Sequence, residues 1–321
     1  MTFGNHTQER TPEVAVIGTG TMGSAMARRL LGAEMNVRVW SRHSVSTKPL
    51  VDLGAAAFEK ASDAVRDADV VITMLPTYEA TADVLFAGRA LVAMRPGSIW
   101  VQMATVGVEA TERLATQTRT LRPDVAFVDA PVSGSREPAE SGRLLILASG
   151  PPAASEPLES VFSALGRATL WLGPAGAGSR MKLILNTWLA FQTEGAAEAA
   201  ALAERLGVST SSLFDALSDN PLASKYALAK LARMVEQDYH ADFSLDWALK
   251  DLDLVASAAG AGVAPIAVAI ADRWRELVSE GSSGLDVSAA RRGLGGNDPV
   301  RPGARSSELL IGADRELSDT H

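Results

Sequence analysis

The stretch VAVIGTGTMGSAMA, residues 14–27, decides the fold. Its apolar run 14–17 is followed at once by the pattern G-x-G-x-x-G, and the chain then becomes helical in character. In such a turn Gly18 permits a tight bend, Gly20 lets the backbone approach a pyrophosphate, and Gly23 lets helix and strand pack closely. Since free N–H groups at the start of a helix attract phosphate, the pattern predicts a dinucleotide site, with an ordinary glycine-rich turn as the alternative. The residues expected to contact the dinucleotide here are Gly18, Thr19, Gly20, Thr21, Met22 and Gly23.

Short apolar runs alternate with longer helical runs throughout the first half of the chain. Runs such as VVITML at 70–75 are apolar on both faces, which suits parallel strands that are covered by helices on each side. We therefore predict a doubly wound α/β sheet over residues 12–174. The expected strands are 14–17, 37–40, 70–74, 98–102, 126–128 and 144–148.

The composition changes after Pro174. Runs of β-branched residues disappear, and Ala, Leu, Glu and Arg dominate long segments, which predicts an all-helical second domain over residues 175–296. The remaining segment, 297–321, lacks apolar periodicity and is expected to be a flexible tail. The expected helices are 179–206, 209–217, 223–235, 245–259 and 265–279.

The composition also argues against several classes of protein. A chain of 321 residues exceeds what one core usually organises, so two domains are expected. A net charge of −8 without a Lys/Arg cluster argues against nucleic acid as a partner. No run reaches the roughly 20 apolar residues of a membrane helix, and there is no cysteine, which suits a reducing cytosol. We expect a soluble cytoplasmic protein with no membrane partner, and the apolar helix at 196–206 predicts a homodimer.

The end of the second expected strand bears on the choice of dinucleotide. Enzymes that use NAD present Asp or Glu about 20 residues past the glycines, where the carboxylate bonds the ribose 2′-hydroxyl. This chain has Ser41, Arg42 and His43 there instead. A guanidinium suits a 2′-phosphate, so NADP(H) is preferred over NAD(H), with a solvated surface arginine as the alternative.

Four blocks of sequence stand out by their order and spacing: the glycine turn, DAPVSGS at 129–135, GAGSRMKLILN at 176–186, and FSL at 243–245 with KDL at 250–252. Together they resemble the β-hydroxyacid dehydrogenase family, whose members include 3-hydroxyisobutyrate dehydrogenase and the glyoxylate/succinic semialdehyde reductases. The resemblance implies a Rossmann domain and an all-α domain, with a long interdomain helix. It also implies a cleft in which hydride passes between nicotinamide C4 and a small hydroxy acid or aldehyde acid.

Lys182 and Asn186 are the strongly polar positions of an otherwise apolar helix and share one face, four residues apart. A buried ammonium is costly and tends to have a lowered pKa, which eases proton exchange with an alcohol or carbonyl oxygen. The resemblance implies that Lys182 is the general acid/base and that Asn186 holds substrate. The alternative is a lysine that extends from a domain edge into water. Where the family commonly has a second Asn, this chain has Thr187, which faces away from Lys182.

The loop at 129–135 follows an expected strand and offers a hydroxyl and flexible N–H groups, which can anchor a carboxylate. The resemblance implies that Ser133 and Gly134 hold the substrate, whereas a plain Ser-Gly turn is the alternative. The family usually continues with a second Gly, so Ser135 is expected to narrow the pocket or to change the acid that it admits.

The remaining predicted contacts lie on the cofactor side of the cleft. Lys250 shares a helical face with Phe243, and the resemblance implies that both line the cofactor, with an exposed Asp246–Lys250 ion pair as the alternative. Residues that follow two of the strands match further cofactor contacts of the family, with packing or a turn as the alternative. These residues are Met74, Leu75, Pro76 and Thr105. No cluster of His or carboxylates suggests a metal, so metal-free hydride transfer is expected.

Two other functions are compatible with the sequence. An imine reductase shares the two-domain plan and often the NADPH preference but generally lacks the lysine at position 182. A catalytically silent NADP(H)-binding protein keeps the cofactor site without the reaction. The expected small-molecule partner is therefore a hydroxy acid or an aldehyde acid, or else an imine.

Overall fold

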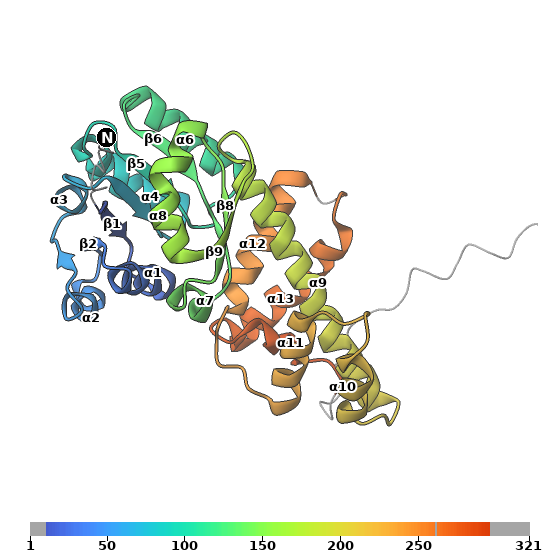
Figure 1. The fold of residues 1–321 in the computed structure, drawn as a ribbon. Helices are drawn as coiled ribbons and strands as arrows, with labels where there is room; N and C mark the ends of the chain where they lie inside the picture. The colour runs from blue at the N-terminus through green and yellow to red at the C-terminus, as the bar shows by residue number, and fades with distance from the viewer. Residues whose placement is uncertain (1–10, 261, 296–321) are drawn as a thin grey trace, which may run out of the picture.

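Six parallel strands form the central sheet of the first lobe (Figure 1). The structure, a computed structural model, describes residues 11–260 and 262–295. The strand order is β3-β2-β1-β4-β5-β6, so the direction of winding reverses between β1 and β4. Ligands of such open sheets bind beyond the carboxyl ends of the strands at this switch point. The strands are β1 (Glu13–Ile17), β2 (Asn36–Trp40), β3 (Ala56–Ala57), β4 (Val70–Thr73), β5 (Ile99–Gln102) and β6 (Ala126–Asp129).

Helices cover both faces of this sheet because the strands are apolar on both faces. Val14 and Val16 of β1 belong to one core, and Ala15 and Ile17 belong to the core on the opposite face. The α-helices of this lobe are α1 (Thr21–Gly32), α2 (Lys48–Val51), α3 (Ala61–Val65), α4 (Tyr78–Ala82), α5 (Ala90–Ala93), α6 (Val108–Leu121), α7 (Arg136–Glu140) and α8 (Ser155–Leu165). Shorter turns of helix are η1 (Ser44–Thr47), η2 (Asp83–Ala87) and η3 (Pro152–Ala154).

A second, three-stranded sheet follows β6. It has the order β7-β8-β9, with β7 antiparallel and β9 parallel to β8. Its strands are β7 (Val132–Ser133), β8 (Leu144–Ala148) and β9 (Gly166–Trp171). The sequence predicts β8 but not the other two, because β7 has only two residues and β9 is a half-exposed strand without an apolar run.

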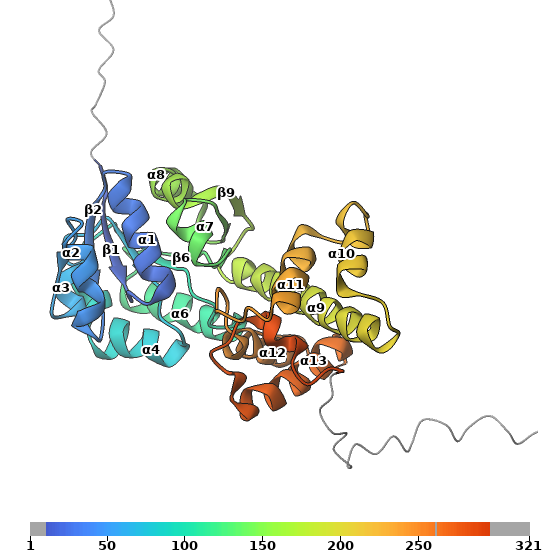
Figure 2. The ribbon, with the colours of Figure 1, turned by 90° about the horizontal axis from the view of Figure 1, so that it is seen from below.

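The second lobe is helical and is entered through one long helix. This helix, α9, spans Ala177–Arg205 and runs from the first lobe along the whole second lobe (Figures 1 and 2). The others are α10 (Thr210–Ser218), α11 (Lys225–Glu236), α12 (Leu245–Ala259), α13 (Pro265–Leu277), η4 (Val278–Ser282) and η5 (Val287–Arg291). The predicted doubly wound α/β sheet, joined by a long helix to an all-α part, is confirmed. The predicted tail at 297–321 lies outside the described residues.

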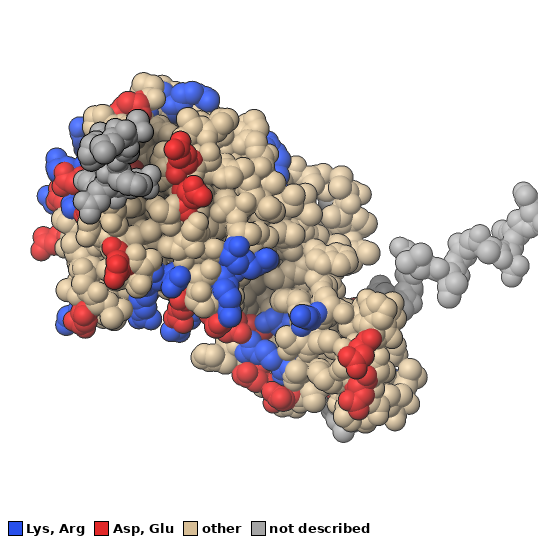
Figure 3. Space-filling model, viewed as in Figure 1, with Lys and Arg blue, Asp and Glu red and all other residues tan. Residues whose placement is uncertain are grey.

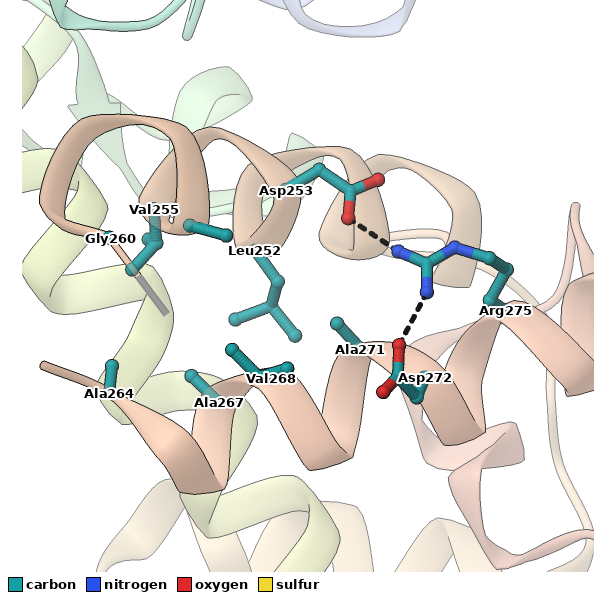
Figure 4. A pocket seen from close by; sticks show the side chains of 11 residues that line it. Leu252, Asp253, Val255, Gly260, Ala264, Ala267, Val268, Ala271, Asp272 and Arg275 are labelled. Atoms are coloured by element: carbon teal, nitrogen blue, oxygen red, sulfur yellow. Dashed lines mark hydrogen bonds and ion pairs between the residues drawn. The ribbon is translucent and has the colours of Figure 1, made fainter. Parts of the chain in front are cut away.

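Small residues let α12 and α13 pack closely. They leave a cavity of about 60 Å³, lined by apolar side chains such as Leu252, Ala267 and Ala271 (Figure 4). At one end Arg275 bonds Asp253 and Asp272, each at 2.7 Å. With an apolar lining and its charged groups already paired, this cavity is a packing gap rather than a ligand site.

Candidate active site

The turn between β1 and α1 forms a cradle. A Cβ added at Gly18 would lie 2.6 Å from the Met74 carbonyl oxygen, and one at Gly23 would lie 1.9 Å from the Gly18 carbonyl oxygen. A Cβ at Gly20 would meet nothing within 4 Å, and both Gly20 and Thr21 are exposed. No side chain caps α1, so its first N–H groups have no side-chain partner. The turn therefore fits the pyrophosphate of a dinucleotide.

Two side chains of this turn point into the protein. Thr19 is buried, and its Oγ1 lies 2.7 Å from Ser46 Oγ. Met22 packs against the core of the first lobe. The buried Thr19 therefore leaves its backbone groups for a ligand, whereas Met22 is only half-buried.

The segment after β2 carries an unpaired cation. Arg42 and His43 are exposed and Ser41 is half-buried. Ser46 Oγ donates to the His43 carbonyl oxygen (2.8 Å) and contacts Thr19, which ties this segment to the glycine turn. Arg42 has no hydrogen-bond or ion-pair partner within the described chain. Its guanidinium is therefore available to an anionic ligand.

A buried network, which the sequence analysis did not identify, fixes the carboxyl ends of β4 and β5. Thr73 Oγ1 donates to Gln102 Oε1 (2.8 Å), and Gln102 Nε2 donates to the Ala104 carbonyl oxygen (2.9 Å). The network holds the segment that leads into Thr105. Of the four predicted contacts after these strands, Leu75 is buried, Met74 and Thr105 are half-buried, and Pro76 is exposed.

Lys182 lies in the second turn of α9, close to a buried carboxylate. Asn186 Nδ2 donates to Asp251 Oδ2, and the two residues are 6% and 3% exposed. Burial lowers the pKa of the half-buried Lys182 amine below its ordinary value, while Asp251 opposes this shift and Lys250 adds to it. Such an amine releases its proton more readily than a solvated lysine.

Lys250 reaches from α12 to the first lobe. Its Nζ donates to the Thr105 carbonyl oxygen and lies 2.9 Å from Asp251 Oδ1. That buried oxygen is balanced by the Lys250 ammonium and accepts no further hydrogen bond from the described residues. Asp246 instead accepts from Ser283 Oγ (3.1 Å). The alternative of an exposed Asp246–Lys250 ion pair is therefore wrong.

The loop after β6 lies against the start of α9, which packs on β6, β7 and β8. Ser133 and Ser135 are half-buried, and Gly134 is exposed with a φ of +133°. The positive φ favours glycine at this position, and a Cβ there would also lie 2.9 Å from Leu144 Cδ2. The fold thus places this loop beside the helix that bears Lys182.

Asp129 and Asp251 are buried acids to which the sequence analysis assigned no role. Burial raises the pKa of Asp129 to about 6, and hydrogen bonds from Ser179, Ser149 and Gly176 oppose the rise. Asp251 lies at helical spacing from the apolar residues of α12 that face the core. The feature of the sequence that could have identified Asp251 is an acidic residue on the apolar face of an expected helix.

A cavity of about 650 Å³ opens between the lobes, lined by residues of α4, α6 and α12. Its lining includes Pro76, Thr105 and Lys250, which are three of the predicted cofactor contacts. Phe243 lies elsewhere: it packs against the helical core, and its N–H donates to Asp286 Oδ2 (3.3 Å). The structure brings Lys250 close to the ends of the strands, whereas Phe243 is part of the packing of the helical lobe.

On the face seen in Figure 3 the surface is hollowed where the lobes meet, and both basic and acidic side chains lie beside this hollow. The chain as a whole has a net charge of −8.

Residues 11–260 and 262–295 contain no group of three or more His, Asp or Glu side chains that could hold a metal ion. Within the same residues, no helix is both long and apolar enough to cross a membrane.

Known proteins resemble this chain along nearly all of its described length. Residues 13–173 match the NAD binding domain of 6-phosphogluconate dehydrogenase, and residues 176–294 match the domain described as NAD-binding of NADP-dependent 3-hydroxyisobutyrate dehydrogenase. Glyoxylate/succinic semialdehyde reductase 1 of Arabidopsis thaliana is 31% identical over 280 residues, which are 86% of this chain and 96% of the relative. The chain belongs to the β-hydroxyacid dehydrogenase family. It is thus an NAD(P)-dependent oxidoreductase of the class that acts on CH–OH groups.

Other proteins that are similar to this chain differ from it in length or in stated activity. Mycobacterium tuberculosis 3-hydroxyisobutyrate dehydrogenase, solved with L-serine, is 29% identical with a TM-score of 0.80, covering 88% of this chain and 98% of that one. Human cytokine-like nuclear factor N-PAC is 31% identical over 284 residues, 87% of this chain but 51% of the relative. An imine reductase from Myxococcus stipitatus, at 22% identity and a TM-score of 0.61, covering 88% of this chain and 99% of that one, shares the fold.

Proposed function

We propose that this chain is an NADP(H)-dependent β-hydroxyacid dehydrogenase that interconverts a small hydroxy acid and an aldehyde acid, with Lys182 as general acid/base. The observation that carries the proposal is the position of Lys182 on α9, one turn before the Asn186–Asp251 pair, where burial lowers the pKa of its amine. A lysine that extends into water would not have such surroundings.

The first lobe would hold the dinucleotide. The cradle at Gly20 and the first N–H groups of α1 suit the pyrophosphate, Arg42 suits a 2′-phosphate, and the strand ends near Thr105 suit the nicotinamide half. Met74, Leu75 and Pro76 would border this half, and Lys250, which bonds the Thr105 carbonyl oxygen, would close it from α12. When bound there, NADP(H) supplies or accepts the hydride.

Lys182 would exchange the proton of the reacting oxygen. In the reducing direction its ammonium donates a proton to the carbonyl oxygen, and in the oxidising direction its neutral amine accepts the proton of the hydroxyl. Asp251 fixes the amide of Asn186, which can then orient the same oxygen. No other titratable group has to take part in this step.

Ser133 and Gly134 would anchor the carboxylate. A hydroxyl and backbone N–H groups are suitable donors for an anion. Ser135 adds a side chain where the family usually has Gly, so we expect a preference for a smaller acid.

An NADPH-oxidation panel tests the proposal. It sets glyoxylate, succinic semialdehyde and tartronate semialdehyde beside a cyclic imine, and repeats the best case with NADH. We expect turnover of at least one aldehyde acid and none of the imine. Turnover of the imine alone would make the chain an imine reductase, and binding of NADPH without any turnover would make it a silent binding protein.

Arg42→Asp tests the choice of cofactor. A charge-assisted bond of about 1.5–3 kcal/mol would be lost, so the Kd for NADPH should rise by a factor of about 10 to 100 while that for NADH stays unchanged. Titration of each cofactor against protein fluorescence measures both constants. Arg167→Asp is the control, since this exposed arginine lies on β9, far along the chain from the glycine turn. Equal weakening of both cofactors by Arg42→Asp would refute the 2′-phosphate assignment.

We further propose a homodimer formed through the helical lobe. Leu202 of α9 and Leu206, the residue that follows α9, are 58% and 69% exposed, and α10 has no buried residue. Helices of this kind usually gain stability by packing against another surface. The cytoplasmic location and the domain boundaries 12–174 and 175–296 stay predictions.

A further inference from the structure

One buried carboxylate, which lies outside the group of Lys182, Asn186 and Asp251, connects the loop that contains Ser133 to the start of α9. Asp129 is the last residue of β6 and is 0% exposed. The chain continues from it into the loop that contains Ser133, and its side chain faces the start of α9, the helix that bears Lys182. Nothing in the proton exchange described above uses this group.

The Asp129 carboxylate gathers four hydrogen bonds. Its Oδ2 accepts from the N–H groups of Gly176 (3.2 Å) and Ser179 (2.8 Å). Ser149 Oγ donates to the same oxygen (3.1 Å), and Ser179 Oγ donates to Oδ1 (2.8 Å). The carboxylate therefore serves as the N-terminal cap of α9, supplied by a different element of the fold.

Contacts around this cap leave little room for the helix to shift. Ser149 Oγ accepts from the N–H of Gly178 (2.9 Å), where an added Cβ would lie 2.1 Å from the Leu147 carbonyl oxygen. Ser179 Oγ also lies 3.0 Å from Thr111 Oγ1 in the first turn of α6. The start of α9 is thus held by three parts of the first lobe at once.

We propose that Asp129 is a positioning residue for Lys182: it fixes the start of α9 against the Ser133 loop and so sets the separation between the proton donor and the carboxylate anchor. The inference rests on the proposed function, in which those two groups act on one substrate. Lys182 follows Ser179 by less than one helical turn, so a shift of the helix start moves the amine with it.

Asp129→Ala removes all four acceptor contacts and tests the proposal. A misplacement of about 1 Å can cost a factor of about 10² in rate, so we expect kcat per folded molecule to fall by a factor of about 10 to 100. The Kd for NADPH should stay unchanged, because the glycine turn is a separate element. Asp129→Asn keeps one acceptor oxygen toward the N–H groups and should restore most of kcat.

Glu194→Ala is the matched control on the same helix. Glu194 is also buried, accepts from Trp274 Nε1 (2.8 Å) and pairs with Arg273, but it lies in the helical lobe, three turns beyond Lys182. Its loss should lower the melting temperature as Asp129→Ala does and leave kcat per folded molecule unchanged. Equal losses of kcat in the two variants would show a merely structural role and overturn the proposal.

Two readouts need no turnover and separate this inference from the proposed function. Hydrogen exchange of the amides at 176–180 should accelerate in Asp129→Ala and not in Glu194→Ala. Labelling of Lys182 by an amine reagent, followed by mass spectrometry, should move toward the reactivity of a solvated lysine in Asp129→Ala alone. If hydrogen exchange at 176–180 and labelling of Lys182 in Asp129→Ala were the same as in the wild type, the inference would be overturned, even if the enzyme proves active.

Ser149→Ala serves if Asp129→Ala does not fold. It removes the acceptor for the Gly178 N–H and one donor to Asp129. We therefore expect the same changes in kcat, hydrogen exchange and Lys182 labelling, each smaller than in Asp129→Ala. A folded Ser149→Ala protein with unchanged kcat, exchange and labelling would contradict the inference.

Discussion

Lys182→Met should lower kcat for the best aldehyde acid by a factor of about 10² to 10⁴, the usual contribution of a positioned general acid/base. Methionine fills a similar volume but carries no proton. The Kd for NADPH should stay unchanged, because the cradle at Gly20 and the cation at Arg42 lie in the first lobe. Steady-state kinetics and a cofactor titration measure the two quantities.

The same variant should gain stability while it loses activity. Since the pKa of Lys182 is lowered in the folded protein, the charged amine is disfavoured there at neutral pH. This cost is present below the folded pKa and disappears as pH rises from that value toward 10.5, the ordinary value for lysine. The melting temperature of Lys182→Met should therefore exceed that of the wild type at pH 7, and the difference should shrink as pH rises.

Lys225→Met is the control for this pair of measurements, because Lys225 is exposed at the start of α11. It should change neither kcat nor the melting temperature by much. If Lys182→Met kept the wild-type kcat, Lys182 would not be the proton donor, whatever its effect on stability.

Gly23→Ala should abolish cofactor binding and destabilise the first lobe. Its Cβ would lie 1.9 Å from the Gly18 carbonyl oxygen, so the turn and α1 have to separate. Such an overlap within a packed core costs about 1–3 kcal/mol or more. Thermal unfolding and NADPH titration should both show the loss.

Gly20→Ala is the matched variant in the same turn. Its Cβ would meet no protein atom within 4 Å, so the melting temperature should stay close to that of the wild type. The methyl group would nevertheless occupy the cradle, and the Kd for NADPH should rise by a factor of about 10 or more, equivalent to about 1.4 kcal/mol. If Gly20→Ala bound NADPH normally, the pyrophosphate would not lie at this cradle.

The elements that were predictable from the sequence are those whose pattern is local. VVITML shows a strand buried on both faces, and the expected helix 245–259 coincides with α12 because its apolar spacing and its end at Gly260 are both local signals. Strand β9 was missed because its side chains are half-exposed and lie on the edge of a small sheet. Its pairing with β8 is a contact between distant parts of the chain.

The site was predictable only in part for the same reason. Lys182 and Asn186 stand out as polar positions on an apolar helix, but the partner of Asn186, Asp251, comes from another helix. Lys250 has Asp246 at the spacing of a helical ion pair, yet in the folded chain it reaches Thr105 in the other lobe. The first contact requires α9 and α12 to pack side by side, and the second requires the two lobes to meet.

The pH dependence of hydride transfer, measured in both directions by single-turnover kinetics, tests the central claim most directly. Reduction needs the protonated amine of Lys182, so its rate should fall as pH rises through the lowered pKa of this group. Oxidation needs the neutral amine, so its rate should rise through the same pKa, below 10.5. Both inflections should vanish in Lys182→Met, and inflections that persist in that variant would contradict the account.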